Sequence, residues 1–204
     1  LYQNWQHANW NVTGDLSLSQ TDSDLIQKQP DWIGKNDKLR ASVDGMVLSA
    51  SLRGEYLIET SLLDIIPHAG VNYNQLTTKS FDTKNNKKES VFHTDKGTQY
   101  IWQFPVGVKL AKSFALDSGW NLRTQADAAL VQVSGDRNSE NRLHTVGIHT
   151  SDIISAEIMD KSGFNGQLGV IVQKKDMAFG VGYNINASQH NTDHTIGATW
   201  SLAF

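Results

Sequence analysis

Almost the whole chain alternates apolar and polar side chains with a period of two residues. Successive side chains of a β-strand point to opposite faces of the sheet. The alternation therefore predicts strands that each have one apolar and one polar face. The final segment shows this most clearly, because small or polar residues separate its apolar ones. Its apolar side chains are Ile196, Ala198, Trp200, Leu202 and Phe204.

Strand length distinguishes a soluble β-sandwich from a membrane β-barrel, since the strands of both have one apolar and one polar face. A soluble β-sandwich also alternates, but its strands average about five or six residues. The alternating segments here run from about ten to nearly twenty residues, and a tilted strand needs about nine to eleven to cross a bilayer. We therefore predict an all-β, antiparallel transmembrane β-barrel. Its eight full strands begin near residues 10, 38, 63, 98, 120, 163, 177 and 193, and residues 1–5 end a ninth.

The polar faces of these strands carry mainly Gly, Ser, Asn and Gln, with a few charges of both signs. A barrel in lipid turns its polar residues toward the lumen, where small side chains fit and opposite charges can pair. The charged and histidine side chains predicted to face the lumen are Arg53, Glu55, Asp64, His68, Lys109, Arg123 and Asp127.

The lengths of the connections alternate as well. Outer-membrane barrels have short periplasmic turns and longer external loops. If the last residue lies at the periplasmic rim, every short turn falls on that side and every long loop falls outside. The short turns are predicted near 6–9, 58–62, 116–119 and 174–176, and the longer loops near 21–37, 80–97 and 137–162.

Composition permits this fold and excludes some functions. The mean hydropathy of -0.40 does not exclude a membrane barrel, because apolar and polar residues alternate along its strands and cancel in the average. The net charge of -3 gives no basic surface for nucleic acid. The chain has no cysteine, so it offers neither a disulfide framework nor a thiolate metal site.

Several stretches resemble the translocator barrel of autotransporters, the proteins of type V secretion. They are "IWQFPVGVKLAKSF", "WNLRTQADAALVQVSGD" and the last 41 residues from Phe164, together with the Pro67, Ala69 and Gly70 pattern. The resemblance implies a twelve-stranded barrel in the outer membrane of a Gram-negative bacterium, with a helical segment in its pore. Residues 1–204 would form one domain that matches the last eight strands and the tail of the fourth. We therefore expect further strands, the pore helix and a passenger before Leu1.

The resemblance also implies partners. The barrel-assembly machinery recognises the C-terminal strand of such proteins, so Ile196, Ala198, Trp200, Leu202 and Phe204 would form an assembly signal. In physical terms, that strand is an unpaired edge open to strand addition. Further implied partners are periplasmic chaperones, the protein's own passenger, the lipid bilayer and lipopolysaccharide. No nucleic acid and no cofactor is implied.

Two groups of histidines are candidate sites. His190 and His194 flank Asp193, but they straddle a predicted turn and spacing fixes no third metal ligand. His144 and His149 lie among Ser and Asp residues without a nucleophile-elbow pattern. We therefore expect no catalytic residue and no metal.

Two alternative functions stay open from sequence. A small outer-membrane barrel enzyme, such as a surface protease or lipase, would use Asp193 with His190 or His194. A porin-like or adhesin-like barrel would carry its function in its long loops.

Overall fold

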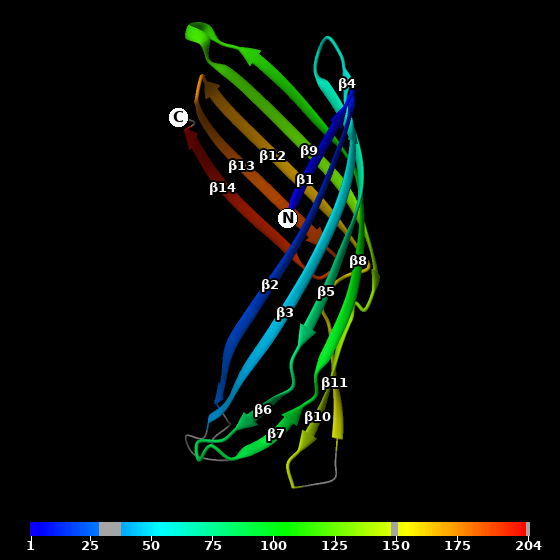
Figure 1. The fold of residues 1–204 in the computed structure, drawn as a ribbon, viewed down its shortest axis with the longest axis vertical. Coiled ribbons are helices and arrows are strands. Elements are labelled where there is room, and N and C mark those ends of the chain that lie inside the picture. The colour runs from blue at the N-terminus through cyan, green and yellow to red at the C-terminus, as the bar shows by residue number, and fades with distance from the viewer. Residues whose placement is uncertain (29–37, 148–150, 203–204) are drawn as a thin grey trace.

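The computed structural model describes residues 1–28, 38–147 and 151–202, and these residues form a single antiparallel sheet (Figure 1). The sheet contains fourteen strands among the described residues, together with one short 3-10 helix at Asp117–Gly119. In the described part of the chain, no helix is long and apolar enough to cross a membrane. The all-β antiparallel prediction is confirmed.

Nine strands form the main body of the sheet, and each pairs with the next in this order. The predicted starts of the eight full strands all lie within one residue of the observed starts, because the alternation is strongest in these segments. The nine strands are β1 (Tyr2–His7), β2 (Trp10–Lys28), β3 (Lys38–Tyr56), β5 (Asp64–Thr78), β8 (Gly97–Ala115), β9 (Asn121–Gly135), β12 (Ser162–Lys174), β13 (Met177–Ser188) and β14 (Thr192–Leu202).

The long loops were predicted wrongly, because much of their length is strand. The stretch 80–97 contains β6 (Phe81–Lys84) and β7 (Ser90–Thr94), and 137–162 contains β10 (Asn138–Thr145) and β11 (Ser151–Glu157). These four strands pair with one another, and β6 also pairs with β3, so the sheet continues beyond its main body. Strand β2 likewise runs to Lys28, whereas residues 29–37 lie outside the described range. Polarity suggested loops here, yet neighbouring strands supply the backbone hydrogen bonds regardless of side-chain type. A two-residue strand, β4 (Ile58–Glu59), pairs with β5 in one of the short turns.

The two faces of the sheet differ in chemistry and in exposure. On β8, Gln99 is 8% exposed and the Lys109 side chain 21%, whereas Trp102 is 42% exposed and Val106 60%. Apolar side chains thus cover an open face, and no second sheet packs on it among the described residues. This arrangement is the reverse of a soluble sandwich, which buries its apolar faces against each other.

The sheet is strongly curled, so that β12, β13 and β14 pass behind β2 and β3 in the view of Figure 1. Side chains on the inner side of such a curl converge, and those on the outer side spread apart. The buried polar face is the inner one, as the contacts across the curl described below require. The outer face is the apolar one.

The outer face carries an apolar band of definite height. On β8 the exposed apolar side chains run without interruption from Tyr100 to Leu110. Ten steps of about 3.4 Å make about 34 Å of strand, which a tilt of about 40–45° reduces to roughly 25 Å, the height of the lipid-facing band of outer-membrane barrels. Aromatic pairs mark its limits: the rings of Tyr73 and Trp102 are 4.7 Å apart and those of Trp10 and Tyr56 are 4.9 Å apart.

A charge placed in the middle of this band should be costly. We expect Val106→Arg in the full-length protein to lower its unfolding free energy in lipid vesicles by about 2–4 kcal/mol, the cost of a basic side chain at the bilayer midplane. Val106→Leu is the control and should be close to neutral. Equal stability of the two variants in a urea titration would show that this face meets water rather than lipid.

Candidate functional site

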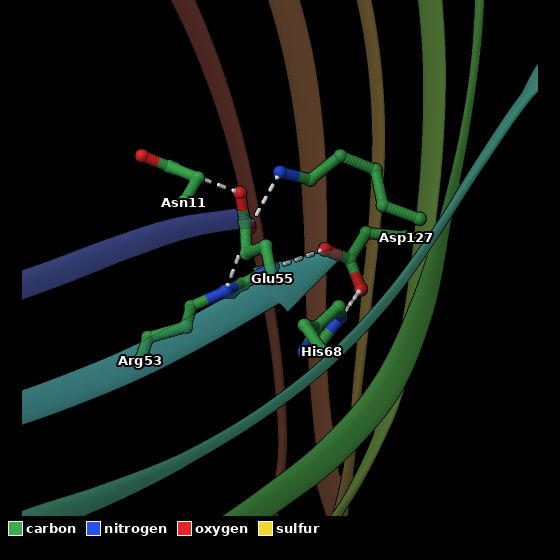
Figure 2. A network of polar contacts seen from close by, with 6 residues as sticks. Asn11, Arg53, Glu55, His68 and Asp127 are labelled. Carbon is green, nitrogen blue, oxygen red and sulfur yellow. Dashed lines mark hydrogen bonds and ion pairs between the residues drawn. The ribbon is translucent and has the colours of Figure 1, made fainter. Parts of the chain in front are cut away.

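The inner face holds a network of charged side chains drawn from four strands (Figure 2). Arg53 Nη2 donates to Asp127 Oδ2 at 3.0 Å, and His68 Nε2 lies 2.8 Å from Asp127 Oδ1. Lys109 Nζ donates to Glu55 Oε1 at 2.9 Å. Arg53 Nε lies 2.9 Å from the same oxygen, an ion-pair contact that lacks the angle of a hydrogen bond. Two carboxylates are therefore held by two permanent cations and one histidine.

Strand register explains why these residues meet. Glu55 on β3 lies opposite His68 on β5, and Lys109 on β8 lies opposite Asp127 on β9. Arg53 and Asp127 are three strands apart, which in a flat sheet would separate their backbones by about 14 Å. Their direct ion pair shows that both side chains point into the curl.

Gly107 makes room for the centre of the network. It lies opposite His68 on β5 and opposite Ala129 on β9. A Cβ at this position would meet the carbonyl oxygen of Ala128 and would lie 2.7 Å from His68 Cε1. The missing side chain lets the imidazole lie over the strand, where the His68 side chain is only 2% exposed.

The network has unused hydrogen-bonding capacity. Arg53 Nε and His68 Nδ1 are buried, and neither makes a hydrogen bond with the described residues. Buried polar atoms without a partner are costly, so such atoms usually meet water, an ion or another chain. Arg53 Nε keeps its ion-pair contact with Glu55, so His68 Nδ1 is the network atom that has no polar partner among the described residues.

The structure brings together five of the seven predicted polar residues. Asp64 and Arg123 lie on the same face, but nearer the short turns, where they line a pocket with Glu55. Sequence reasoning missed Asn11, whose Nδ2 donates to Glu55 Oε2 at 3.2 Å. Its position opposite Glu55 follows only from the register of β2 and β3.

The C-terminal strand lies at one edge of the sheet. Ile196, Ala198, Trp200 and Leu202 share the face of β14 that continues the apolar face of β13, and Ile196 is 79% exposed. In the part of the chain that the structure describes, β14 pairs only with β13. Phe204, the last residue of the predicted assembly signal, lies outside the described residues.

The contacts of the histidine side chains differ from the groupings that the sequence suggests. His190 Nδ1 lies 2.6 Å from Asp160 Oδ1, so Asp160 and not Asp193 is its carboxylate. His194 Nδ1 lies 2.7 Å from the Tyr183 hydroxyl. Hydrogen bonds from Ser188 and from His190 lower the pKa of Asp160 to about 2, which keeps this carboxylate ionised. His144 contacts Asp95 at 3.0 Å, and His149 lies outside the described residues.

Comparison with known families adds a decisive observation. The family model described as "Autotransporter beta-domain" matches residues 1–184. The chain belongs to the autotransporter β-domain family. The members of this family are outer-membrane β-barrels of Gram-negative bacteria that act in secretion, so the family and the location predicted from sequence are confirmed. The match ends within β13, and β14 lies beyond it. No curated protein matches the chain.

Removing the central carboxylate should loosen the network. Asp127→Ala would leave Arg53 and His68 without their shared acceptor, and a hydrogen bond to a charged group is worth about 1.5–3 kcal/mol. We expect a loss of that size in urea unfolding of the full-length protein. Asp176→Ala, in the turn between β12 and β13, is the matched control and should change stability little. A neutral effect of Asp127→Ala would contradict a structural role for the network.

Gly107 allows a second test with an internal control. Gly107→Ala should cost about 1–3 kcal/mol, the usual penalty for overpacking, because backbone atoms of β9 cannot move aside. Gly54→Ala should be tolerated, because a Cβ there would meet nothing within 4 Å. The fraction of protein that migrates as folded barrel on an unheated gel measures both. Similar folded fractions would refute the close packing of His68 over β8.

Proposed function

We propose that residues 1–204 form one domain, most of the wall of a closed, twelve-stranded translocator barrel. This barrel supports the export of an N-terminal passenger to the cell surface. The observation that carries the proposal is the division of the sheet into an apolar, exposed outer face and an inner face with a paired charge network. A secretion barrel needs both, since lipid surrounds it and a polar chain passes through it.

Closure follows from the chemistry of the two open edges. Among the described residues β1 pairs only with β2, and β14 only with β13. Hydrocarbon cannot satisfy the free backbone groups of such edges, so membrane-spanning sheets close on themselves. Further strands of the full-length protein would fill the space between β1 and β14. The count of twelve rests on the family resemblance.

The inner network is the proposed contact for the segment inside the pore. Arg53, Glu55, His68, Lys109 and Asp127 would face the lumen, with Asp64 and Arg123 nearer the periplasmic end. The Arg53 side chain, which is 38% exposed, would offer hydrogen bonds to the pore helix or to the passing passenger. The paired charges leave little net field, which suits a pore that must not hold its cargo tightly.

Assembly is proposed to proceed through the edge strand. The predicted signal consists of Ile196, Ala198, Trp200 and Leu202 of β14 together with Phe204. The barrel-assembly machinery would bind it through strand addition, after periplasmic chaperones deliver the chain. The short turns would lie in the periplasm and the strand-rich hairpins outside. The bilayer and lipopolysaccharide would then contact the outer face. No catalytic group or cofactor is needed for this role.

Neighbouring residues of β5 test the orientation of the wall. Asn72 lies on the inner face and Val71 on the outer face, opposite Leu52. A photo-reactive amino acid at either position, in full-length protein stalled during secretion, reports what each face meets. We expect passenger crosslinks from position 72 and none from position 71. Crosslinks to the passenger from both positions, or from neither, would overturn the proposed path through this lumen.

A further inference from the structure

A second polar cluster lies away from the inner network, where two turns of the sheet approach each other. Glu157 ends β11, Asp160 lies between β11 and β12, and His190 lies in the turn between β13 and β14. One ligand atom from each of the three residues lies within 4.8 Å of the other two. Sequence reasoning could not find the cluster, because Asp160 and His190 are 30 positions apart.

The cluster is held in place before any ligand arrives. The Asp160 side chain is only 8% exposed, although it belongs to a connection between strands. The backbone N–H of His190 donates to Asp160 Oδ2 at 2.9 Å, which fixes the carboxylate against the opposite turn. The His190 side chain is 63% exposed and reachable from solvent.

The surrounding cavity has a strong excess of negative charge. It has a volume of about 640 Å³, and its lining includes Glu157, Asp160, Asp193 and His190. Neither Lys nor Arg is among the lining residues that the structure describes. Arg137 reaches Glu157 from outside the cavity lining, where its Nη1 donates to Oε1 at 3.1 Å. This ion pair is exposed and therefore weak, and it leaves Glu157 Oε2 for another partner.

The donor set selects the class of ligand. Two carboxylates and one imidazole suit a borderline divalent cation such as Zn²⁺, which takes His nitrogen and carboxylate oxygen at about 2.0–2.2 Å. Small rotations of the exposed Glu157 and His190 side chains would bring the three atoms onto one ion. Three protein ligands leave at least one coordination position for water or an outside ligand.

We propose that Glu157, Asp160 and His190 form a Zn²⁺-binding site that joins the β11–β12 connection to the β13–β14 turn. Its ligands lie in the connections and not in the network of β3, β5, β8 and β9, although the same cavity also reaches Asn72 and Gln103 on the inner face. A bound ion replaces the hydrogen bond between His190 Nδ1 and Asp160 Oδ1 with two coordination bonds, and the proton on Nδ1 is released to solvent. It thereby fixes two turns that are distant in the sequence.

The test is a Zn²⁺ titration of the untagged full-length protein, purified in detergent and stripped of metal, by isothermal calorimetry. We expect one saturable site per chain. His190→Gln and Glu157→Gln should each weaken it more than about tenfold, the loss that even a supporting residue of a metal site can cause. His194→Gln is the matched control, since His194 contacts Tyr183, and should leave the affinity unchanged.

A second measurement does not depend on variants that must fold. Diethylpyrocarbonate modifies accessible histidines, and mass spectrometry then reports each one in the wild-type protein. Zn²⁺ should protect His190 and leave His194 reactive, whereas the same concentration of Ca²⁺ should protect neither. Absence of saturable Zn²⁺ binding, binding that survives both substitutions, or equal protection by Ca²⁺ would overturn the proposal.

Discussion

Completion of the backbone hydrogen-bond ladder is the constraint on which this structure depends. A strand in hydrocarbon has no water to satisfy its N–H and C=O groups, so each long strand must lie between two others. Among the described residues, the nine strands of the main body meet this requirement except for β1 and β14 at its edges. Odd-numbered and even-numbered side chains of each strand then face opposite sides of the sheet, because the strand is pleated.

This alternation, together with strand register, also determines which side chains meet on the inner face. Glu55, His68, Lys109 and Asp127 need no special loop to hold them, because the register of four neighbouring strands already places them together. The curvature of the sheet brings Arg53 and Asp127 close enough to form an ion pair, although they are three strands apart. Gly107 is the local adjustment that gives the imidazole its space. The network thus depends on the register of all four strands. Shifting one strand by one residue would turn its network side chains to the other face and break their contacts.

The sequence predicts those features that repeat with period two and misses those that depend on register between distant strands. The starts of β2, β3 and β13 follow from alternation alone. The short strands β6, β7, β10 and β11 are too polar for that signal, because hydrogen bonds to neighbours and not apolar faces make them strands. The sequence predicted five members of the inner network, but it also named Asp64 and Arg123, which lie apart, missed Asn11 and gave no pairs. The partner of His190 was also out of reach, since Asp160 lies in the connection between β11 and β12, 30 positions away.

The length of the strands has a mechanical consequence. On β3 the outward apolar side chains stop at Met46, yet the strand continues back to Lys38, with Asp44 tied to Lys79 at 3.1 Å. Eight further residues make about 27 Å of strand, or about 20 Å of height at the same tilt. Strands β2 and β6 pair with β3 along this extension, and β7 and β10 continue the sheet from β6 (Figure 1). In the proposed barrel, an exported chain would stay beside protein for about 20 Å beyond the outer limit of the apolar band.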